Sequence, residues 1–577
     1  MAIPVRIRRP HADPLTGATL PALLAQLYAR RGATGHATEP TLAHLLPGDT
    51  LHGLAAAAAL LADQVQRDRP LVVVGDFDAD GATGSALALL GLRALGATQV
   101  SHFTPSRFAH GYGLSPAIVE AAAARDPALL ITVDNGIASL EGVARARERG
   151  IPVLVTDHHL AGAELPAAAA IVNPNQPGCA FPSKHLAGVG VMFYLLVATR
   201  GELRRRGHFG PTRPEPNLAH YLDLVALGTV ADVVTLDHNN RILVEQGLRR
   251  IRAGHCRPGV RALLEVAGRT LADTTARDLG FAAGPRLNAA GRLQDMGLGV
   301  ECLVTAEGGR AMALAQQLHA LNAERREIED GMRAQAEAIV ADLAQRQPDH
   351  LPAAWCVSGA DWHQGVSGIV AARVRERWHC PVIAFAPAGA DRWRGSARSI
   401  EGLHVRDLID TVTKRHPGLV TRFGGHAMAA GLEVPAAALD AFSAAFTAAV
   451  AAAVGDQARE RAICSDGALP PALLTLDTAA GVRRAGPWGK GFPEPVFDAV
   501  FAILAHRVVG ERHLKLTVRA PGGAVLDAIA FNQADALATL GAQAHLAYRL
   551  DVNRFRGECT LQLLVEHIAP AAEDTPA

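Results

Sequence analysis

Three aspartates stand at alternate positions in one short run of the sequence. Asp76, Asp78 and Asp80 lie in Val73-Val74-Gly75-Asp76-Phe77-Asp78-Ala79-Asp80-Gly81, after the apolar, strand-like stretch Leu71–Val74. Carboxylates packed this closely repel one another unless cations lie among them. On a straight strand Asp76 and Asp80 would be about 13 Å apart, so the chain must curl here or the carboxylates must bind separate ions. The run predicts a metal site.

Two further strand-like runs also end in residues that bind metals. Asp134 follows Leu129–Val133, and Asp157-His158-His159 follows Val153–Thr156. Paired catalytic ions lie about 3.5–4 Å apart with a carboxylate bridging them, and Asp134, on a strand of its own, suits that bridge. These strand ends together predict a hydrolase that uses two metal ions.

The remaining donors indicate which metal is preferred. A neutral His158 can supply a nitrogen ligand, and Asp232, in Gly228-Thr229-Val230-Ala231-Asp232-Val233-Val234, a further oxygen. A mixed set of imidazole and carboxylate ligands favours Mn²⁺, with Mg²⁺ as a physiological substitute. Such ions generate a hydroxide nucleophile near neutral pH and offset the charge that builds on a phosphoryl group.

These motifs are also compatible with purely structural roles. Aspartates after a strand can cap a helix, and the alternating pattern resembles the start of an EF-hand loop. The EF-hand pattern requires a glutamate six positions after Gly81, where Leu87 stands. A pair of adjacent histidines is often structural. The metal hypothesis is favoured because the acidic strand ends occur together.

The elements that carry these motifs follow a βαβ rhythm. Short apolar runs alternate with longer stretches rich in Ala, Leu and Arg, which predicts a parallel sheet. In such sheets the loops at the carboxyl ends of the strands form the ligand crevice, and the acidic residues fall on those loops. The strand candidates are Leu71–Val74, Leu129–Val133, Val153–Thr156 and Ala170–Val172.

The rest of the chain divides by composition. The stretch from about Thr305 to Gln347 contains no proline and no strand-like run, which indicates one long helix. Such a helix would reach roughly 60 Å at 1.5 Å per residue. A second α/β lobe follows, with strands at Ala354–Ser358 and Val382–Ala386, and alternation in His513–Arg519 and Thr560–Val565 predicts a small barrel. We expect a helical lead-in at residues 1–70, a catalytic domain at 71–304, a connecting helix at 305–347, a substrate-binding domain at 348–455 and a β-barrel at 456–577.

Bulk composition excludes several classes of protein. The formal net charge of 0 means that any nucleic-acid site must be a local patch. The 7 cysteines include no C-x-x-C pair, which argues against a disulfide framework or zinc finger and fits a reducing compartment. The longest apolar run, Leu54–Ala62, is too short to span a bilayer. We expect a cytoplasmic protein that does not act at a membrane.

The motifs together resemble a known family, the DHH phosphoesterases, which are named for the motif that stands here as Asp157-His158-His159. Asp76–Gly81 resembles their first motif, Val133–Gly136 their second and Leu227–Asp232 their fourth. The resemblance extends from about Leu71 to near the C-terminus and implies a DHH-type parallel-sheet domain, a long helix, a DHH-associated α/β domain and an OB-fold barrel. Phe77 departs from the tyrosine that is more usual there and leaves the ligands untouched.

The resemblance also implies residue roles. Metal ligands are expected among Asp76, Asp78, Asp80, Asp134, His158 and Asp232, with His159 approaching the scissile phosphate. Taken singly, the basic and Gly-rich segments, including Gly284–Arg292, Gly395–Ser399 and Arg422–Gly431, are expected to be turns or tight helix contacts. In relatives of this kind Arg107, Arg286, Ser396 and Arg398 would hold a 5′ end, and Gly424-Gly425-His426 resembles a nucleotide-binding signature.

Within the family, the likeness is to 5′→3′ exonucleases specific for single-stranded DNA that release mononucleotides in repair and recombination. It implies two Mn²⁺ or Mg²⁺ ions and, as plausible partners, single-strand-binding protein and a helicase of the RecQ type. An oligoribonuclease or cyclic-dinucleotide phosphodiesterase of the same family is the enzymatic alternative, disfavoured by the length and the C-terminal barrel. A catalytically inactive scaffold that binds single strands is the third hypothesis, disfavoured because every expected ligand type is present.

Overall fold

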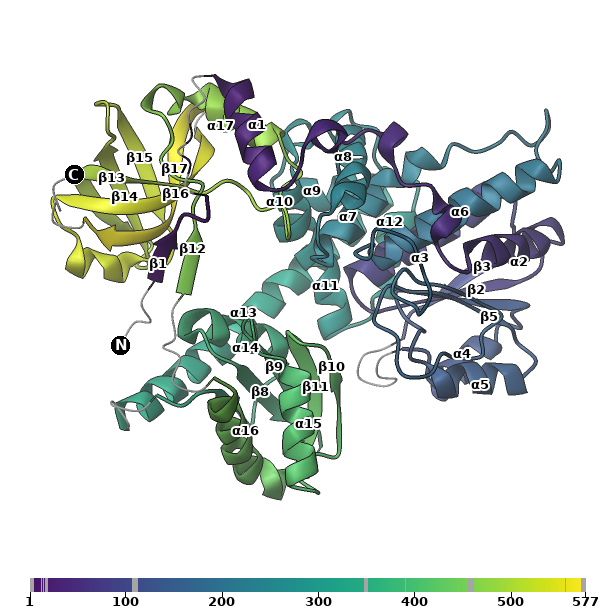
Figure 1. The fold of residues 1–577 in the computed structure, drawn as a ribbon. Coiled ribbons are helices and arrows are strands. Elements are labelled where there is room, and N and C mark those ends of the chain that lie inside the picture. The colour runs from purple at the N-terminus through teal and green to yellow at the C-terminus, as the bar shows by residue number, and fades with distance from the viewer. Residues whose placement is uncertain are drawn as a thin grey trace. The chain divides into compact units, whose positions relative to one another are not determined.

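The structure is a computed structural model that describes residues 5–11, 13, 15, 19–105, 113–346, 351–389, 391–454, 461–555 and 557–571. Residues 1–8 and 323–464 form one compact unit, and residues 9–322 and 465–577 form another. Figure 1 labels the elements of both. Arg107 lies outside the described residues.

A parallel sheet organises the larger unit. Its strands run in the order β3-β2-β4-β5-β6, and each neighbouring pair is parallel. Every residue of β2, β4 and β5 is buried, as expected for a sheet covered on both faces. The strands are β2 (Leu71–Gly75), β3 (Val100–Phe103), β4 (Leu129–Val133), β5 (Val153–Thr156) and β6 (Ala170–Val172).

Alternate residues of these strands enter different cores. Leu71 and Val73 pack with α2, α3, α6 and α7, whereas Val72 and Val74 pack with α4 and α5 on the opposite face (Figure 1). The helices of this unit are α1 (Leu20–Arg30), α2 (Leu54–Gln66), α3 (Ala79–Leu95), α4 (Pro116–Ala123), α5 (Leu140–Glu148), α6 (Gly188–Arg205), α7 (Leu222–Ala231), α8 (His238–Arg252), α9 (Pro258–Glu265), α10 (Ala276–Asp278), α11 (Gly284–Leu293), α12 (Gly297–Val304) and α17 (Leu476–Arg484).

A closed barrel completes the larger unit. Its strand order is β13-β14-β15-β17-β16, with β15 and β17 parallel and the other neighbours antiparallel. Leu23 and Leu27 of α1 and Val482 of α17 pack into its core. The strands are β13 (Phe497–Val509), β14 (His513–Arg519), β15 (Val525–Ala530), β16 (Gln543–Phe555) and β17 (Glu558–Pro570).

The smaller unit contains a mixed sheet in the order β10-β11-β9-β8-β7, in which β7 and β8 are parallel. One face packs against α14 and the last part of α13, and the other against α15 and α16. A separate parallel pair joins β1 to β12. The elements are β1 (Val5–Arg8), β7 (Trp355–Ser358), α14 (Gln364–Trp378), β8 (Val382–Pro387), β9 (Arg392–Arg398), α15 (Val405–Arg415), β10 (Arg422–Gly425), β11 (Ala429–Pro435), α16 (Leu439–Val454) and β12 (Arg461–Cys464).

One long helix, α13 (Gly308–Arg346), begins in the larger unit and ends in the smaller one, as the sequence predicts. By length and apolar composition Ala436–Val454 is the one straight helix among the described residues that could cross a membrane. Its Phe442, Phe446 and Val450 are nevertheless buried in the core of its own unit.

The α/β class, the parallel sheet, the long helix and the barrel are confirmed. Residues 284–292 lie in α11 and form the tight helix contact that was expected there as the alternative to a turn, because Gly284 and Gly291 allow the helix to pack against Ala231 and the Phe77 carbonyl. Other local predictions are wrong. The segments around Ser396 and Arg422 are strands of one sheet rather than turns, and the lead-in contains β1 as well as helices.

A buried carboxylate fastens the barrel to the segments that precede it. Asp498 on β13 accepts hydrogen bonds from Arg9 Nε at 3.0 Å, His545 Nε2 at 2.7 Å and the Ser465 hydroxyl. Burial alone would raise the pKa of Asp498, but these donors hold it well below its ordinary value. The stabilisation is therefore present above about pH 4 and is lost as the pH falls through the lower folded pKa.

We expect Asp498→Asn to lower the free energy of local unfolding of the barrel by about 1.5 kcal/mol, because the hydrogen bonds from Arg9, His545 and Ser465 lose their charged acceptor. Amide hydrogen exchange at β13 and β16 measures this directly. Asp527→Asn, at a half-buried pair with Lys515 (2.9 Å) on the same barrel, is the matched control and should change little. Equal exchange in both variants would contradict the role given to Asp498.

Candidate metal centre

The first turn of α3 gathers the first acidic motif. Asp78 is the N-cap, and its Oδ1 accepts the backbone N–H groups of Asp80 and Gly81, both at 3.0 Å. The carboxylate of Asp80 accepts the backbone N–H groups of Gly188 and Val189 at 2.6 and 2.9 Å, at the start of α6. The curl expected between Asp76 and Asp80 is this strand-to-helix turn.

Asp134 follows β4 in a backbone conformation that is rare outside glycine. Its φ is +62°, and its N–H donates to the Thr156 carbonyl at 3.1 Å, which holds it against β5. Asn135 donates to the carbonyls of Val74 and Val133 and so joins the ends of β2 and β4. A Cβ at Gly188 would lie 2.6 Å from the Asp134 Cβ, so α6 approaches this closely only with glycine there.

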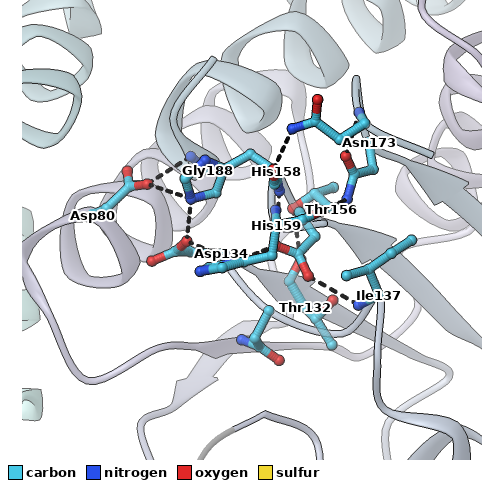
Figure 2. A network of polar contacts seen from close by, with 12 residues as sticks. Asp80, Thr132, Asp134, Ile137, Thr156, His158, His159, Asn173 and Gly188 are labelled. Atoms are coloured by element: carbon cyan, nitrogen blue, oxygen red, sulfur yellow. Dashed lines mark hydrogen bonds and ion pairs between the residues drawn. The ribbon is translucent and has the colours of Figure 1, made fainter. Parts of the chain in front are cut away.

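Asp157 positions the histidines that follow it, a role that we did not assign from the sequence. Its buried carboxylate accepts the backbone N–H groups of Ile137, His158 and His159 at 2.9, 2.7 and 3.1 Å, and His159 Nδ1 at 2.8 Å. Asn173 donates to the His159 carbonyl at 2.9 Å (Figure 2). The signal was available, because Asp157 ends a buried strand and begins the motif.

The predicted donors converge on one place. His158 Nε2 lies 3.0 Å from Asp134 Oδ1, 3.6 Å from Asp232 Oδ2 and 3.8 Å from Asp80 Oδ2. Figure 2 shows Asp80, Asp134, His158 and His159 facing one another. Groups whose ligand atoms lie within 4.8 Å of one another are Asp76, Asp78 and Asp134; Asp80, His158 and Asp232; and Asp134, His158 and His159.

Asp232 reaches the cluster from a helix. It caps the C-terminal end of α7, whereas the other donors follow β2, β4 and β5. The sequence analysis assigned Asp232 to no element, and the structure shows that it is the ligand that does not follow a strand. A carboxylate at a helix C-terminus faces the negative end of the helix dipole, which adds to the need for a cation.

The electrostatics of the cluster fit divalent cations. Burial and then neighbouring carboxylates raise the pKa of Asp134 and Asp232 well above their ordinary values, and the pKa of Asp80 to about 7. Burial, followed by the charge of His159, lowers the pKa of His158 to about 4 and keeps it a neutral nitrogen donor. Bound cations offset the repulsion that disfavours ionised carboxylates here. The donor set of oxygens with imidazole suits Mn²⁺ or Mg²⁺.

His159 differs from His158. Burial would lower its pKa, but the hydrogen bond to Asp157 and the surrounding carboxylates outweigh that effect and raise the pKa to about 9. The hydrogen bond from His159 also helps to hold the pKa of Asp157 below its ordinary value although that carboxylate is buried. His159 therefore carries a proton at neutral pH, and its side chain is 43% exposed.

The residues expected to hold substrate fall in both units. Arg286, on α11 of the larger unit, is buried, with Nε 3.1 Å from His319 Nδ1 and Nη1 donating to the Ala282 carbonyl. In the smaller unit, the hydroxyl of Ser396 lies 2.9 Å from that of Ser367, and Arg398 Nη1 donates to the Ala397 carbonyl at 2.8 Å. Gly424 and Gly425 end β10, and His426 donates its N–H to the Ala429 carbonyl.

Two neighbours of these residues escaped the sequence analysis. Ser367 lies in the first turn of α14 and faces Ser396. Asn288 Oδ1 accepts the N–H of Ala79 at 2.8 Å and so holds α11 against the first acidic motif. Asn288 lies in a segment that the sequence singled out, but the partners of both residues are distant along the chain.

Comparisons with known proteins agree with this geometry. Family models match at residues 70–229 (DHH family, N-terminal domain), 351–452 (DHHA1 domain) and 465–567 (RecJ OB domain). The single-stranded-DNA-specific exonuclease RecJ of Dickeya dadantii (strain 3937) is 53% identical over 98% of this chain and 98% of that protein. The chain belongs to the RecJ family. RecJ of Escherichia coli (strain K12) is 50% identical over 98% of this chain and 99% of its own.

Solved structures of RecJ support the same assignment. The crystal structure of RecJ from Thermus thermophilus in complex with Mn²⁺ has a TM-score of 0.79 and 32% identity, covering 99% of this chain and 80% of that one. Its complex with Mg²⁺ has a TM-score of 0.75, 30% identity and coverage of 99% and 79%. These relatives place this chain in a family of enzymes.

We expect the affinity for Mn²⁺ to rise between about pH 6 and pH 8, because Asp80 and its neighbours must lose protons before a cation binds. Asp134→Asn should weaken Mn²⁺ binding by about 10- to 100-fold or more. Electron paramagnetic resonance of free Mn²⁺ during titration measures both effects.

Asp223→Asn is the matched control for that titration. Asp223 is a buried carboxylate with its pKa raised to about 6, and it accepts the N–H groups of Leu224 and Arg257 outside the cluster. Its substitution should leave Mn²⁺ binding unchanged. A pH-independent affinity, or equal loss in both variants, would contradict the metal assignment.

Proposed function

We propose that this chain is a metal-dependent exonuclease specific for single-stranded DNA, which hydrolyses phosphodiesters from the 5′ end and releases mononucleotides. The observation that carries the proposal is the cluster of Asp80, Asp134, His158 and Asp232, whose donors suit paired divalent cations. Relatives of about half-identical sequence over nearly the whole chain carry the name single-stranded-DNA-specific exonuclease.

Two Mn²⁺ or Mg²⁺ ions would be held by Asp76, Asp78, Asp80, Asp134, His158 and Asp232, with Asp134 between them. Bound there, such ions lower the pKa of a water ligand and offset charge on the phosphoryl group. The chain's own contribution is to hold the carboxylates in fixed positions: the backbone N–H groups of Gly188 and Val189 orient Asp80, and those of Asp80 and Gly81 orient Asp78.

His159 supplies the proton-bearing group of the proposed site. Its raised pKa keeps it cationic near neutral pH, and Asp157 fixes its ring through Nδ1. A cation beside the metals is suited to contact the scissile phosphate and to stabilise the negative charge that develops there. Asp157 is then a positioning residue, acting through His159.

Recognition of the 5′ end would determine polarity. We assign it to Arg286, Ser396 and Arg398 together with Arg107, because guanidinium groups bind phosphate oxygens in pairs. Gly424, Gly425 and His426 complete the proposed substrate contacts. A strand held by its 5′ terminus is cut only from that end.

The alternatives are less well supported. An oligoribonuclease or cyclic-dinucleotide phosphodiesterase does not account for the barrel that the RecJ OB model matches. An inactive scaffold would not need the clustered ligands. We further propose that the domains of the chain end at residues 70, 304, 347 and 455. We also propose a cytoplasmic role in DNA repair and recombination, with single-strand-binding protein and a RecQ-type helicase as partners. These proposals rest on the family resemblance.

Strands labelled at either end test the proposal. With Mn²⁺, a 5′-labelled single strand should release labelled mononucleotide at once, whereas a 3′-labelled strand should shorten gradually, and duplex and short RNA should resist. Asp134→Ala should abolish cleavage yet bind single strands nearly as the wild type does in chelator, because it removes a ligand for the cations and not a contact to the strand. Equal loss of binding and cleavage would mean that Asp134 is structural.

Arg398→Ala tests the 5′-end assignment. We expect it to slow degradation of 5′-phosphorylated strands by about tenfold while affecting 5′-hydroxyl strands less, since one charge-assisted phosphate contact is lost. Arg392→Ala, on the same strand β9 and loosely paired with Glu433 at 4.0 Å, is the control. Single-turnover rates on both substrates provide the comparison, and an unchanged preference would remove the assignment.

A further inference from the structure

A pocket away from the metal centre lies between the barrel and the helices of the larger unit. Its volume is about 290 Å³, and it is lined by α8 and the 3₁₀ turn at Leu271–Asp273 on one side and by α17 and β16 on the other. None of its lining residues belongs to the acidic cluster. None of the metal or substrate contacts proposed above involves a residue that lines this pocket.

The pocket is strongly basic. Of the described residues that line it, Arg252, Arg483, Arg484 and Arg554 are cationic, and only Glu245 and Asp273 are anionic. Glu245 also binds Arg249, which does not line the pocket. Arg249 Nε donates to Glu245 Oε1 at 2.9 Å, whereas Arg252 Nη1 lies 3.4 Å from the same oxygen. Arg483 also lies 3.9 Å from Asp278 Oδ2, a carboxylate outside the lining. Arg252, Arg483 and Arg554 therefore each have an acidic partner, and the excess of positive charge in the lining comes from Arg484.

The paired arginines are held in fixed positions. Arg252 Nε donates to the Thr274 carbonyl at 2.8 Å, Arg483 Nη2 to the Asp273 carbonyl at 3.2 Å, and Arg554 Nη2 lies 2.7 Å from Asp273 Oδ1. Each of these contacts uses part of a guanidinium group that carries five N–H donors. Because the groups are already oriented, an anion that binds them loses less side-chain entropy.

Arg484 is the exception, and it indicates a ligand. Within the described part of the chain no carboxylate lies within ion-pair distance of it, and its side chain is exposed at the pocket wall. Arg484 lies in the last turn of α17, where the helix dipole favours a cation, but joining α17 and β16 to the rest of the unit requires no fourth guanidinium beside the three that are paired. Ala272, Ala480 and Val552 supply short apolar walls that leave room between the guanidinium groups.

We propose that this pocket is a second phosphate-binding site. Guanidinium groups arranged around a cavity match the several oxygens of a phosphate, which they bind in pairs. The phosphate comes from the backbone of the single strand, beyond the nucleotide at the metal centre, or from a free nucleotide. The inference rests on the proposed function and adds to it a contact that anchors the strand at the junction of the barrel and the helices.

Arg484→Gln tests the site with little risk to folding, because Arg484 is exposed and unpaired. Binding of a long single strand in chelator, followed by fluorescence anisotropy, should weaken by about five- to tenfold, and the slope of log affinity against log salt should fall by about 0.7, the value for one phosphate contact on a single strand. Arg205→Gln, on α6 with a 73% exposed side chain paired with Glu202, is the control and should change neither quantity.

A second measurement separates the sources of phosphate. If a free nucleotide occupies the pocket, a deoxynucleoside monophosphate should inhibit wild-type cleavage and Arg484→Gln should relieve that inhibition, with strand binding unchanged. Unchanged strand affinity, salt slope and inhibition would overturn the inference. Arg484-dependent binding by a wild-type protein that does not cleave would instead overturn the proposed exonuclease and leave the phosphate site standing.

Discussion

Mutual repulsion among buried carboxylates is the constraint on which the rest of the larger unit depends. Asp80 and Asp134 are each about 1% exposed, and Asp232 lies within reach of the same imidazole. Without cations the cluster favours protonated acids, as the raised pKa values indicate. The hydrophobic cores on both faces of the parallel sheet must hold these groups together against that repulsion, so stability built elsewhere in the unit maintains the site.

The fold meets this constraint with backbone groups more than with side chains. The N–H groups that begin α3 and α6 bind the carboxylates of Asp78 and Asp80, and the loop after β5 wraps its N–H groups around Asp157. These backbone donors remain when a side chain is substituted, unless the new residue is proline. They also explain why His158 and His159, adjacent in sequence, differ: one is buried against other acids, and the other is bound to Asp157.

Positive charge and negative charge are concentrated at different places in the larger unit. The acidic cluster concentrates negative charge at the carboxyl ends of the strands, while excess positive charge lies at the pocket formed by α8, α17 and β16. A polyanion bound to such a surface can be held through its phosphates at one place and meet cations at another. That arrangement needs no overall positive charge, which is why the formal net charge of 0 does not argue against a nucleic-acid substrate.

The sequence by itself determined the chemistry and the main elements. Buried strands such as Leu129–Val133 are continuous apolar runs, and the acids that follow them must meet because parallel strands end at one edge. Only the tertiary structure revealed that Asp232 comes from a helix, that Asp157 orients His159, that α11 is helical, and that Ser396 and Arg422 lie on paired strands. The packing of α11 and the pairing of β9 with β11 depend on partners far along the chain, and glycine- and arginine-rich segments have weak local preferences, so long-range packing decides them.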